Sequence, residues 1–308
     1  MALPAVRNLK TKLGTAPLTV ATPEKLAALW RACPFVDSVF VLEQPKSLWH
    51  SARQLRAAKF GSAVLLPNSL RSAVETWLAG IPQRAGYARG SRGMFLTTTI
   101  PEPVRNPVRL HQRYFYLDLV TALGGPDDDS MPTLRRDAPP TDVRPVLALC
   151  PGAEYGPAKR WPIESFLAVA RHFLKEHKAR IVLLGAPGDA ALAESFTQAM
   201  PQVENRVGKT SLAEFISALA SAKLVICNDS GAMHVASALG TPTVVFFGST
   251  EPALTGPLGP RAEVLRHHVP CSPCFLRECP LDFACMTSLT PEMAIAAGER
   301  LWKDDFAR

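Results

Sequence analysis

One stretch of the sequence, residues 224–248, orders a strand, a polar turn, a helix and a second strand: LVICNDSGAMHVASALGTPTVVFFG. Its apolar runs, Leu224 to Cys227 and Val244 to Phe247, have the length of buried strands. Small apolar residues recur at helical spacing from Ala232 to Leu239. Two buried strands joined by a helix form a βαβ unit, so this stretch predicts a parallel α/β sheet.

The turn of this unit contains Asn228, Asp229, Ser230 and Gly231. It lies where a strand ends and a helix begins, the edge at which open α/β sheets bind ligands. The amides of Ser230 and Gly231 can donate to phosphate oxygens, and His234 can add a donor, although an isolated helical histidine is otherwise a packing residue. A phosphate would repel a carboxylate, so we expect Asp229 to cap the helix and to accept a hydrogen bond from a sugar or ribose hydroxyl.

A second loop, CPGAEYGPAKRWP, runs from Cys150 to Pro162. Gly152 and Gly156 permit turns ahead of a helix, whose N-terminus exposes amides toward an anion. Lys159 and Arg160 add positive charge where a diphosphate would lie. The alternative is an ordinary loop with a solvated Lys-Arg pair. Because the polar turn described above lies in the same half of the chain, we favour the phosphate hypothesis.

Further βα units fill both halves of the chain. The expected strands are Leu18 to Ala21, Ser38 to Leu42, Ala63 to Leu66, Val146 to Cys150 and Ile181 to Leu184, and the expected helices include Pro162 to His177 and Leu212 to Ala222. Between the halves, Gly124 to Arg144 carries three consecutive aspartates and several prolines, as linkers do. We therefore predict two parallel-sheet domains, 1–143 and 144–308, as the length of 308 residues favours.

Charge and composition limit the partners and the compartment. A formal net charge of +7 favours anionic partners: nucleotide phosphates, an acidic glycolipid or membrane face, or nucleic acid. We expect no nucleic acid, because the sequence has no RNA-binding aromatic motif, zinc-finger spacing or dense Lys/Arg run. With no apolar run of bilayer length and no secretory signal, a cytoplasmic location is expected.

Four of the seven cysteines are spaced C-x2-C-x4-C-x5-C. They are Cys271, Cys274, Cys279 and Cys285. Four thiolates can hold zinc or an iron-sulfur cluster, although this spacing is more compressed than that of paired zinc knuckles. A large chain in a reducing compartment favours reduced thiols that pack a proline-rich loop, and a redox pair is a third alternative. We favour reduced thiols and expect any bound metal to be structural.

Four segments together resemble a known family. The Cys150–Pro162 loop and the Asn228–His234 turn occur with FGSTEP at 247–252 and CSPC at 271–274. As a set they resemble the ADP-heptose:lipopolysaccharide heptosyltransferases of glycosyltransferase family 9, second type, and the resemblance covers essentially the whole chain. It implies a GT-B fold, in which two Rossmann-like domains with parallel sheets face each other across a cleft. It also implies an inverting transfer that needs no metal or cofactor.

The resemblance further implies substrates and residue roles. Heptose from ADP-heptose would pass to the heptose of the lipopolysaccharide inner core, with or without peripheral contact at the inner membrane. The donor site would be lined by Lys159, Asp229, Ser230, Gly231 and His234. Lys159 would bind the phosphates and stabilise the departing ADP. Asp189 would contact the nucleotide ribose or, alternatively, cap the following helix.

In the first half of the chain, Asn68, Ser69 and Arg71 form an Asn-Ser-x-Arg turn after an expected strand, and this turn also resembles the family. Arginine suits phosphates and acidic sugars, so we expect these residues, with Arg84 and Arg89, on the acceptor side. Taken singly, each arginine is more typical of a solvated surface than of a binding site.

One family feature is missing from the chain as given. Members begin with an apolar strand and a Gly-Asp turn ahead of a helix similar to residues 1–10, MALPAVRNLK. The aspartate of that turn is the expected general base, and residues 1–12 contain no Asp, Glu or His. We favour a misassigned start codon as the explanation. The alternative is a truncated homologue that binds nucleotide sugar without catalysis. For the activity itself, the remaining alternative is a family 9 transferase of another type. Loss of an interior strand predicts unpaired neighbours and a less stable first domain.

Overall fold

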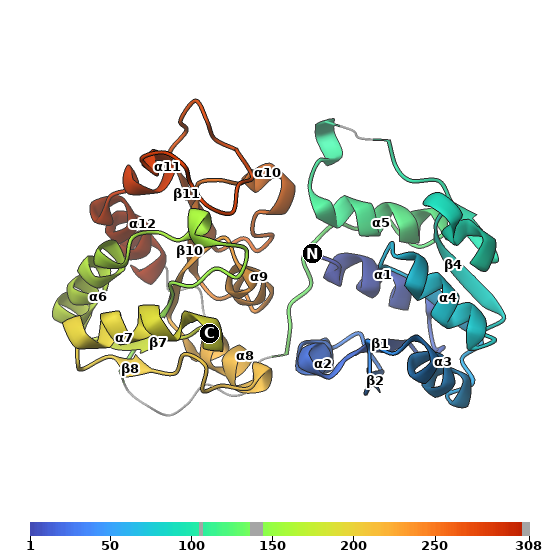
Figure 1. Cartoon of the computed structure of the whole chain (residues 1–308). Coiled ribbons are helices and arrows are strands. Elements are labelled where there is room, and N and C mark those ends of the chain that lie inside the picture. The colour runs from blue at the N-terminus through green and yellow to red at the C-terminus, as the bar shows by residue number, and fades with distance from the viewer. Residues whose placement is uncertain (105–106, 136–143, 304–308) are drawn as a thin grey trace. The chain divides into compact units, whose positions relative to one another are not determined.

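A computed structural model describes residues 1–104, 107–135 and 144–303 (Figure 1). The chain divides into two compact units, Met1–Pro132 and Thr133–Arg308. This division falls before the expected boundary at residue 143, which lies outside the described residues. Leu134 is one reason, because it is buried and its N–H donates to the carbonyl oxygen of Ala238, 2.9 Å away in the second unit.

The first unit contains two parallel ladders in its described residues. Its elements are α1 (Leu3–Leu13), β1 (Thr19–Pro23), α2 (Glu24–Arg31), β2 (Ser38–Leu42), α3 (Leu48–Ala57), β3 (Ser62–Leu65), α4 (Leu70–Leu78), β4 (Gln83–Tyr87), the 3-10 helix η1 (Gly90–Phe95), β5 (Thr98–Ile100), η2 (Pro107–Arg109) and α5 (Gln112–Ala122). One ladder is β1–β2 and the other is β3–β4–β5. The three strands predicted here exist, but they form no single sheet and are mostly half-buried.

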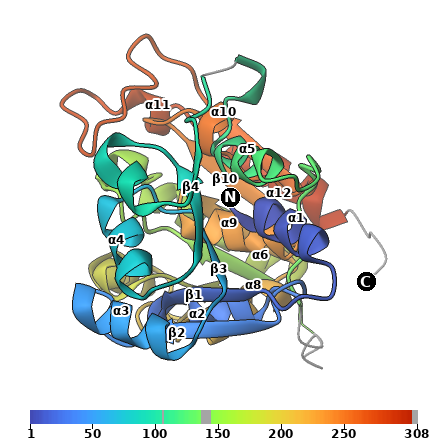
Figure 2. The same ribbon diagram turned by 90° about the vertical axis from the view of Figure 1, so that its right-hand side faces the viewer.

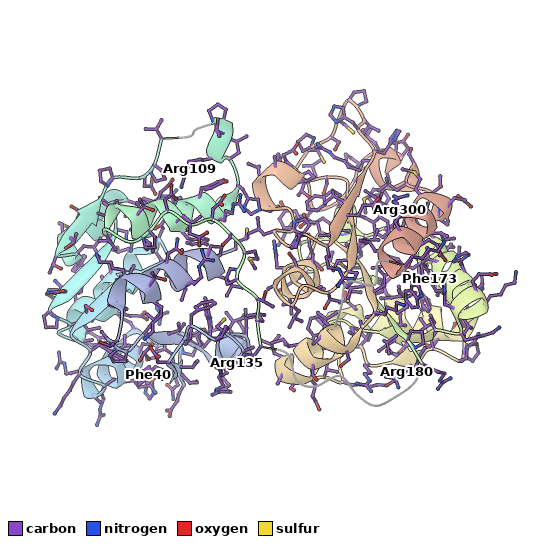
Figure 3. All side chains as sticks on the ribbon, turned by 180° about the vertical axis from the view of Figure 1, so that it is seen from behind. Phe40, Arg109, Arg135, Phe173, Arg180 and Arg300 are labelled. Carbon is purple, nitrogen blue, oxygen red and sulfur yellow. The ribbon has the colours of Figure 1, made fainter. Side chains whose placement is uncertain are left out.

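Small clusters of buried apolar residues contribute to the core of the first unit. Ala5 and Leu117 fill the contact between α1 and α5, which lie side by side (Figures 1 and 2). Leu55 and Leu65 belong to two further clusters, and Phe40, labelled in Figure 3, packs on the cluster of Leu55. Each of these three clusters joins neighbouring elements of the unit.

The aspartate run predicted as linker is instead bound to the first unit. Each of its carboxylates pairs with an arginine. The pairs are Arg109–Asp127 at 2.9 Å, Arg7–Asp128 at 2.8 Å and Arg113–Asp129 at 2.8 Å. The side-chain amide of Asn8 also donates to the carbonyl oxygen of Pro126 at 2.8 Å. The linker prediction is therefore wrong up to residue 132, because these contacts tie the run to α1 and to the region of α5.

The second unit is built on one six-stranded parallel sheet. Its elements are β6 (Val146–Cys150), η3 (Pro157–Lys159), α6 (Ile163–His177), β7 (Arg180–Leu183), η4 (Pro187–Asp189), α7 (Ala190–Ala199), β8 (Glu204–Asn205), α8 (Leu212–Ser221), β9 (Leu224–Asn228), α9 (Gly231–Ala238), β10 (Thr243–Phe247), α10 (Pro252–Thr255), β11 (Ala262–Arg266), α11 (Ala284–Thr287) and α12 (Pro291–Lys303). The strand order is β11-β10-β9-β6-β7-β8. The four strands predicted in this half are confirmed, and β6, β9 and β10 are buried throughout.

A continuous core joins this sheet to α6 and α12. Phe173 of α6, labelled in Figure 3, is fully buried in it. Gly298 of α12 permits the close packing, because a Cβ atom there would lie 2.8 Å from the Phe173 ring. The parallel sheet brings the carboxyl ends of all its strands to one edge, where the sequence predicted a ligand.

Local sequence sets several helix starts. The hydroxyls of Ser47 and Ser69 accept hydrogen bonds from backbone N–H groups in the first turns of α3 and α4. Ser211 and Glu214 form a reciprocal capping box at the start of α8. No described helix combines the length and apolar character needed to span a bilayer.

Candidate functional site

The candidate site lies at the carboxyl edge of the second unit's sheet. β9 pairs with β6 on one side and with β10 on the other, so the loops that leave these three strands are neighbours. The loop after β6 leads into η3, the turn after β9 leads into α9, and the segment after β10 contains Thr250. Residues predicted from two separate motifs therefore meet at one place.

Lys159 and Asp229 form the centre of this site. The Lys159 Nζ atom lies 2.6 Å from Asp229 Oδ2, and the two side chains are 13% and 6% exposed. The Thr250 hydroxyl donates to the same oxygen at 2.6 Å. The expected capping role of Asp229 is wrong, because Ser230 is the N-cap of α9 and the Asp229 carboxylate turns to the lysine and the threonine instead. The ammonium group is thus fixed in a nearly dry setting, where its charge acts more strongly than in water.

Asn228 fixes the loop that carries Lys159. Its fully buried side chain accepts a hydrogen bond from the Trp161 N–H at 3.0 Å and donates to the Pro151 carbonyl at 2.7 Å. The Trp161 ring stacks on Phe246 with 4.0 Å between ring centroids. Both ends of the loop are therefore tied to β9 and β10. The sequence placed Asn228 in the turn but gave it no role, although an amide at the end of a buried strand is a signal for such a clamp.

The segment of residues 271–285, here called the cysteine loop, packs on the loop that carries Lys159. A Cβ atom on Gly156 would lie 2.4 Å from the Arg277 carbonyl oxygen, so the close approach requires glycine. The Tyr155 hydroxyl donates to the Phe275 carbonyl at 2.7 Å, and the Lys159 ammonium lies 4.8 Å from the Tyr155 ring centroid. Tyr155 therefore links the lysine to the cysteine loop.

Ser230, Gly231 and His234 lie at the start of α9, at the same edge as Lys159. Ser230 makes no side-chain cap hydrogen bond, Gly231 is exposed, and His234 is half-buried in the first turn. Several backbone N–H groups in this turn have no partner within the helix, and the helix dipole is positive there. The N-terminus of α9 therefore favours binding of an anion.

Asp189 lies beside the loop that follows β6. Its carboxylate accepts a hydrogen bond from the Ala186 N–H at 3.1 Å and lies 3.5 Å from Arg160. A Cβ atom on Gly152 would fall 2.1 Å from that carboxylate, so Gly152 makes room for it. Asp189 is the N-cap residue of α7, but its side chain makes no capping bond to that helix. The predicted capping alternative is therefore wrong, because the carboxylate closes its own loop.

The residues predicted on the acceptor side lie in the first unit, around the start of α4. The Asn68 side chain accepts a hydrogen bond from Arg92 at 2.8 Å. Ser69 caps α4, and the Arg71 guanidinium pairs with Glu75 at 2.7 Å. Each of these polar groups has a protein partner within the unit.

Sequence reasoning missed Arg92 and gave Arg84 a role that its contacts do not favour. Arg92 is 1% exposed, and burial lowers the pKa of its guanidinium. Its Nε and Nη2 atoms have no hydrogen-bond partner among the described residues. The Arg84 guanidinium donates to the carbonyls of Phe95 and Ile81, whereas Arg89 is exposed, 3.8 Å from Glu102. Charged residues ordinarily indicate a surface, which is why the burial of Arg92 was not predicted.

The four cysteines of the cysteine loop line one cavity of about 20 Å³. All are free thiols. Burial, with the nearby thiols of Cys279, Cys271 and Cys274, raises the pKa of the Cys285 thiol. The cavity also borders Ser249 and Ala158, so the thiols lie beside the candidate site. The packing of reduced thiols stays the prediction for this set, and metal binding stays its alternative.

A positioned lysine, glycine-bearing loops and a helix N-terminus at the carboxyl edge of a parallel sheet are the arrangement of nucleotide-binding α/β proteins. The sequence model of glycosyltransferase family 9 (heptosyltransferase) matches residues 48–284. Lipopolysaccharide heptosyltransferase 2 of Escherichia coli K12 is 31% identical over 271 residues, which cover 81% of this chain and 76% of that protein. The structure of E. coli ADP-heptose LPS heptosyltransferase II covers 99% of this chain and 95% of that chain, with 26% identity and a TM-score of 0.83.

The chain belongs to glycosyltransferase family 9. It is a glycosyltransferase, and the predicted fold class, GT-B with two Rossmann-like domains and parallel strands, is confirmed. Similarity to lipopolysaccharide heptosyltransferase 1 of E. coli is more local, with 33% identity over 109 residues, or 35% of this chain.

Proposed function

We propose that this enzyme transfers heptose from ADP-heptose to the heptose of the lipopolysaccharide inner core, as a heptosyltransferase of the second type. The observation that carries the proposal is the Lys159–Asp229–Thr250 cluster beside the start of α9. The extent of similarity supports the second type, since the type 2 relative covers 81% of the chain and the type 1 relative covers 35%.

In this proposal the second unit holds the donor. The diphosphate would lie between Lys159 and the first-turn amides of Ser230 and Gly231, with His234 as a further donor. The acceptor hydroxyl forms a bond to the anomeric carbon as the bond from that carbon to ADP breaks, with inversion. Negative charge then grows on the leaving diphosphate, and the fixed ammonium of Lys159 stabilises it. The proton of the hydroxyl passes to a general base, a role that we assign to no described residue.

We assign Asp229 two parts in this reaction. Its Oδ2 atom holds the Lys159 ammonium in place, which makes it a positioning residue. The lysine and the Thr250 hydroxyl offset its negative charge, so the carboxylate can lie near a diphosphate and accept a hydrogen bond from a heptose hydroxyl. Asp189, fixed beside Gly152, is proposed to accept a hydrogen bond from the nucleotide ribose.

The first unit is proposed to bind the acceptor through Asn68, Ser69 and Arg71. The turn that carries them follows β3, at the carboxyl end of a parallel strand. The net charge of +7 supports attraction to the acidic core and peripheral contact with the cytoplasmic face of the inner membrane. A cytoplasmic location is part of the same proposal.

The test combines calorimetric titration of the chain with ADP-heptose and a transfer assay on two core lipids, one with a single heptose and one without heptose. We expect saturable donor binding and transfer only to the lipid that carries heptose. Transfer only to the heptose-free lipid would assign the enzyme to the first type. Binding without transfer would favour a nucleotide-sugar binding protein, and folded protein without binding would contradict the donor site.

A further inference from the structure

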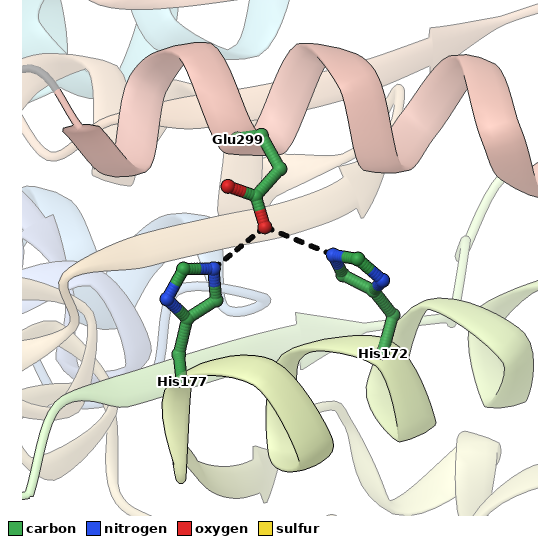
Figure 4. A group of neighbouring side chains, drawn as sticks. All are labelled: His172, His177 and Glu299. Carbon is green, nitrogen blue, oxygen red and sulfur yellow. Dashed lines mark hydrogen bonds and ion pairs between the residues drawn. The ribbon is translucent and has the colours of Figure 1, made fainter.

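Two histidines and a glutamate of the second unit converge on one point. His172 and His177 project from the last turns of α6, and Glu299 projects toward them from α12 (Figure 4). The Nε2 atoms of His172 and His177 lie 2.9 Å and 2.6 Å from the same oxygen, Glu299 Oε1. One nitrogen from each ring and one carboxylate oxygen all lie within 4.8 Å of one another. Three ligand-type atoms thus face a common centre.

Neighbouring side chains hold the glutamate and one of the histidines in this arrangement. The other carboxylate oxygen of Glu299 lies 3.4 Å from Lys303 Nζ, which leaves Oε1 to the imidazoles. The His177 ring packs against Phe173 and Trp302, with ring centroids 5.4 Å and 5.0 Å away. These contacts restrict the ring and reduce the entropy lost when a ligand binds it.

From this geometry we propose that His172, His177 and Glu299 bind a Zn²⁺ ion that links α6 to α12. Two imidazole nitrogens and one carboxylate oxygen form a ligand set that zinc uses in proteins, with water in the fourth position. Zinc bonds of about 2.0–2.2 Å to each ligand replace the present hydrogen bonds after a small adjustment of the side chains. Both Nε2 atoms must lose their protons for this, so each ring keeps its remaining proton on Nδ1.

The site is structural and has no part in the transfer reaction. Lys159 precedes the N-terminus of α6, whereas the histidines lie near its C-terminus. A helix of 15 residues is roughly 22 Å long, too far for a metal at one end to reach a diphosphate at the other. The ion would instead reinforce the packing of Gly298 on Phe173, and the inference stands whatever the sugar substrate is.

The experiment is titration of the full chain with Zn²⁺ alone, followed by calorimetry and by thermal unfolding of the second unit. We expect one Zn²⁺ ion per chain to bind at the His172–His177–Glu299 site. The midpoint of thermal unfolding should rise by about 5–10 °C when the zinc concentration exceeds the dissociation constant of this site about 100-fold. Glu299→Gln and His177→Asn should weaken binding by about 100-fold or more, because each removes a ligand. The double variant Cys271→Ser and Cys274→Ser is the control for thiol binding and should retain this ion.

A spectrum of the unaltered protein keeps the test independent of variant folding. On adding Zn²⁺, two of the seven histidines should lose the Nε2 proton and shift in long-range nitrogen–proton NMR spectra, and both should be assigned to α6. Two outcomes would overturn the proposal. In the first, zinc binds but shifts no histidine of α6. In the second, the cysteine variant loses the zinc and His177→Asn keeps it; in both cases the three side chains form only a hydrogen-bonded ion pair.

Discussion

In the second unit, β6, β9 and β10 are buried at every residue, whereas β1, β2 and β3 of the first unit are mostly half-buried. The difference follows from pairing. β6 and β9 have a strand on each side within one sheet, but β1 and β3 pair on a single side among the described residues. βα units are therefore tightly packed in the second unit and lightly packed in the first.

The two units also differ in how polar groups hold them. In the second unit, buried Asn228 joins the loop that carries Lys159 to the sheet. In the first, partly exposed ion pairs such as Arg109–Asp127 tie the chain's aspartate run to its helices. Buried hydrogen bonds are costly to break, and exposed ion pairs contribute little. We therefore expect the largest effects of substitution in the second unit.

The largest effect is expected from Phe173→Ala. Removing a fully buried ring from the continuous core should lower the free energy of unfolding of the second unit by about 3–5 kcal/mol. Urea unfolding, with hydrogen exchange to locate the change, measures it. Leu281→Ala, at a residue that is 66% exposed, is the control and should change little. Equal losses in the two variants would mean that this core is not continuous.

The next effect concerns catalysis. Lys159→Ala should lower kcat by about 10²–10³-fold, or roughly 3–4 kcal/mol, because it removes the charge proposed to stabilise the departing ADP. Lys175→Ala is the matched control, since Lys175 belongs to the same unit and its side chain is 83% exposed. Turnover and donor affinity that stay at the original level in Lys159→Ala would rule out the proposed role.

Hydrogen exchange should separate the units without any substitution. Amides of β9 should exchange at least about tenfold more slowly than those of β1, a difference of about 1.4 kcal/mol in opening free energy, because β9 has partners on both sides. Mass spectrometry of exchanged peptides measures it. Equal protection of β1 and β9 would show that the first unit is not the weaker one.

The smallest effect is expected at Asp127. The hydrogen bond from Arg109 lowers the pKa of this carboxyl. A carboxylate with a lowered pKa stabilises the folded state above its unfolded pKa of about 3.9, and this stability is lost as pH falls through the lower, folded value. Asp127→Asn should thus lower the free energy of unfolding by under about 1 kcal/mol at neutral pH, and this loss should vanish in acid. Urea unfolding of both proteins, from neutral pH to below the folded pKa of Asp127, tests this pH dependence. A loss of stability that persists in acid would contradict the prediction.

Sequence reasoning succeeded where a local pattern determines the structure. β6, β7, β9 and β10 each contain a continuous apolar run, and the loops beside them carry glycine, lysine and small polar residues. β4 was not predicted, because its sequence, Gln83–Tyr87, contains two polar residues and a glycine. Its strand character comes from pairing with β3 and β5, which no local pattern reveals.

The site was predicted in its parts and not in its contacts. Lys159 and Asp229 were both expected near the donor, but their ion pair depends on the adjacency of β6 and β9. The meeting of His172 with Glu299, and the burial of Arg92, depend in the same way on packing between segments distant in sequence. Each needs tertiary structure, because a pair distant in sequence leaves no periodic signal.

The contact of Gly156 with the Arg277 carbonyl bears on how inhibition of this enzyme is interpreted. The shape of the loop that carries Lys159 depends in part on the cysteine loop. A reagent that alkylates or oxidises a thiol there can therefore displace the lysine without meeting either substrate. Loss of activity after such treatment would report a change in the shape of the loop, and would not by itself identify a thiol that takes part in the reaction.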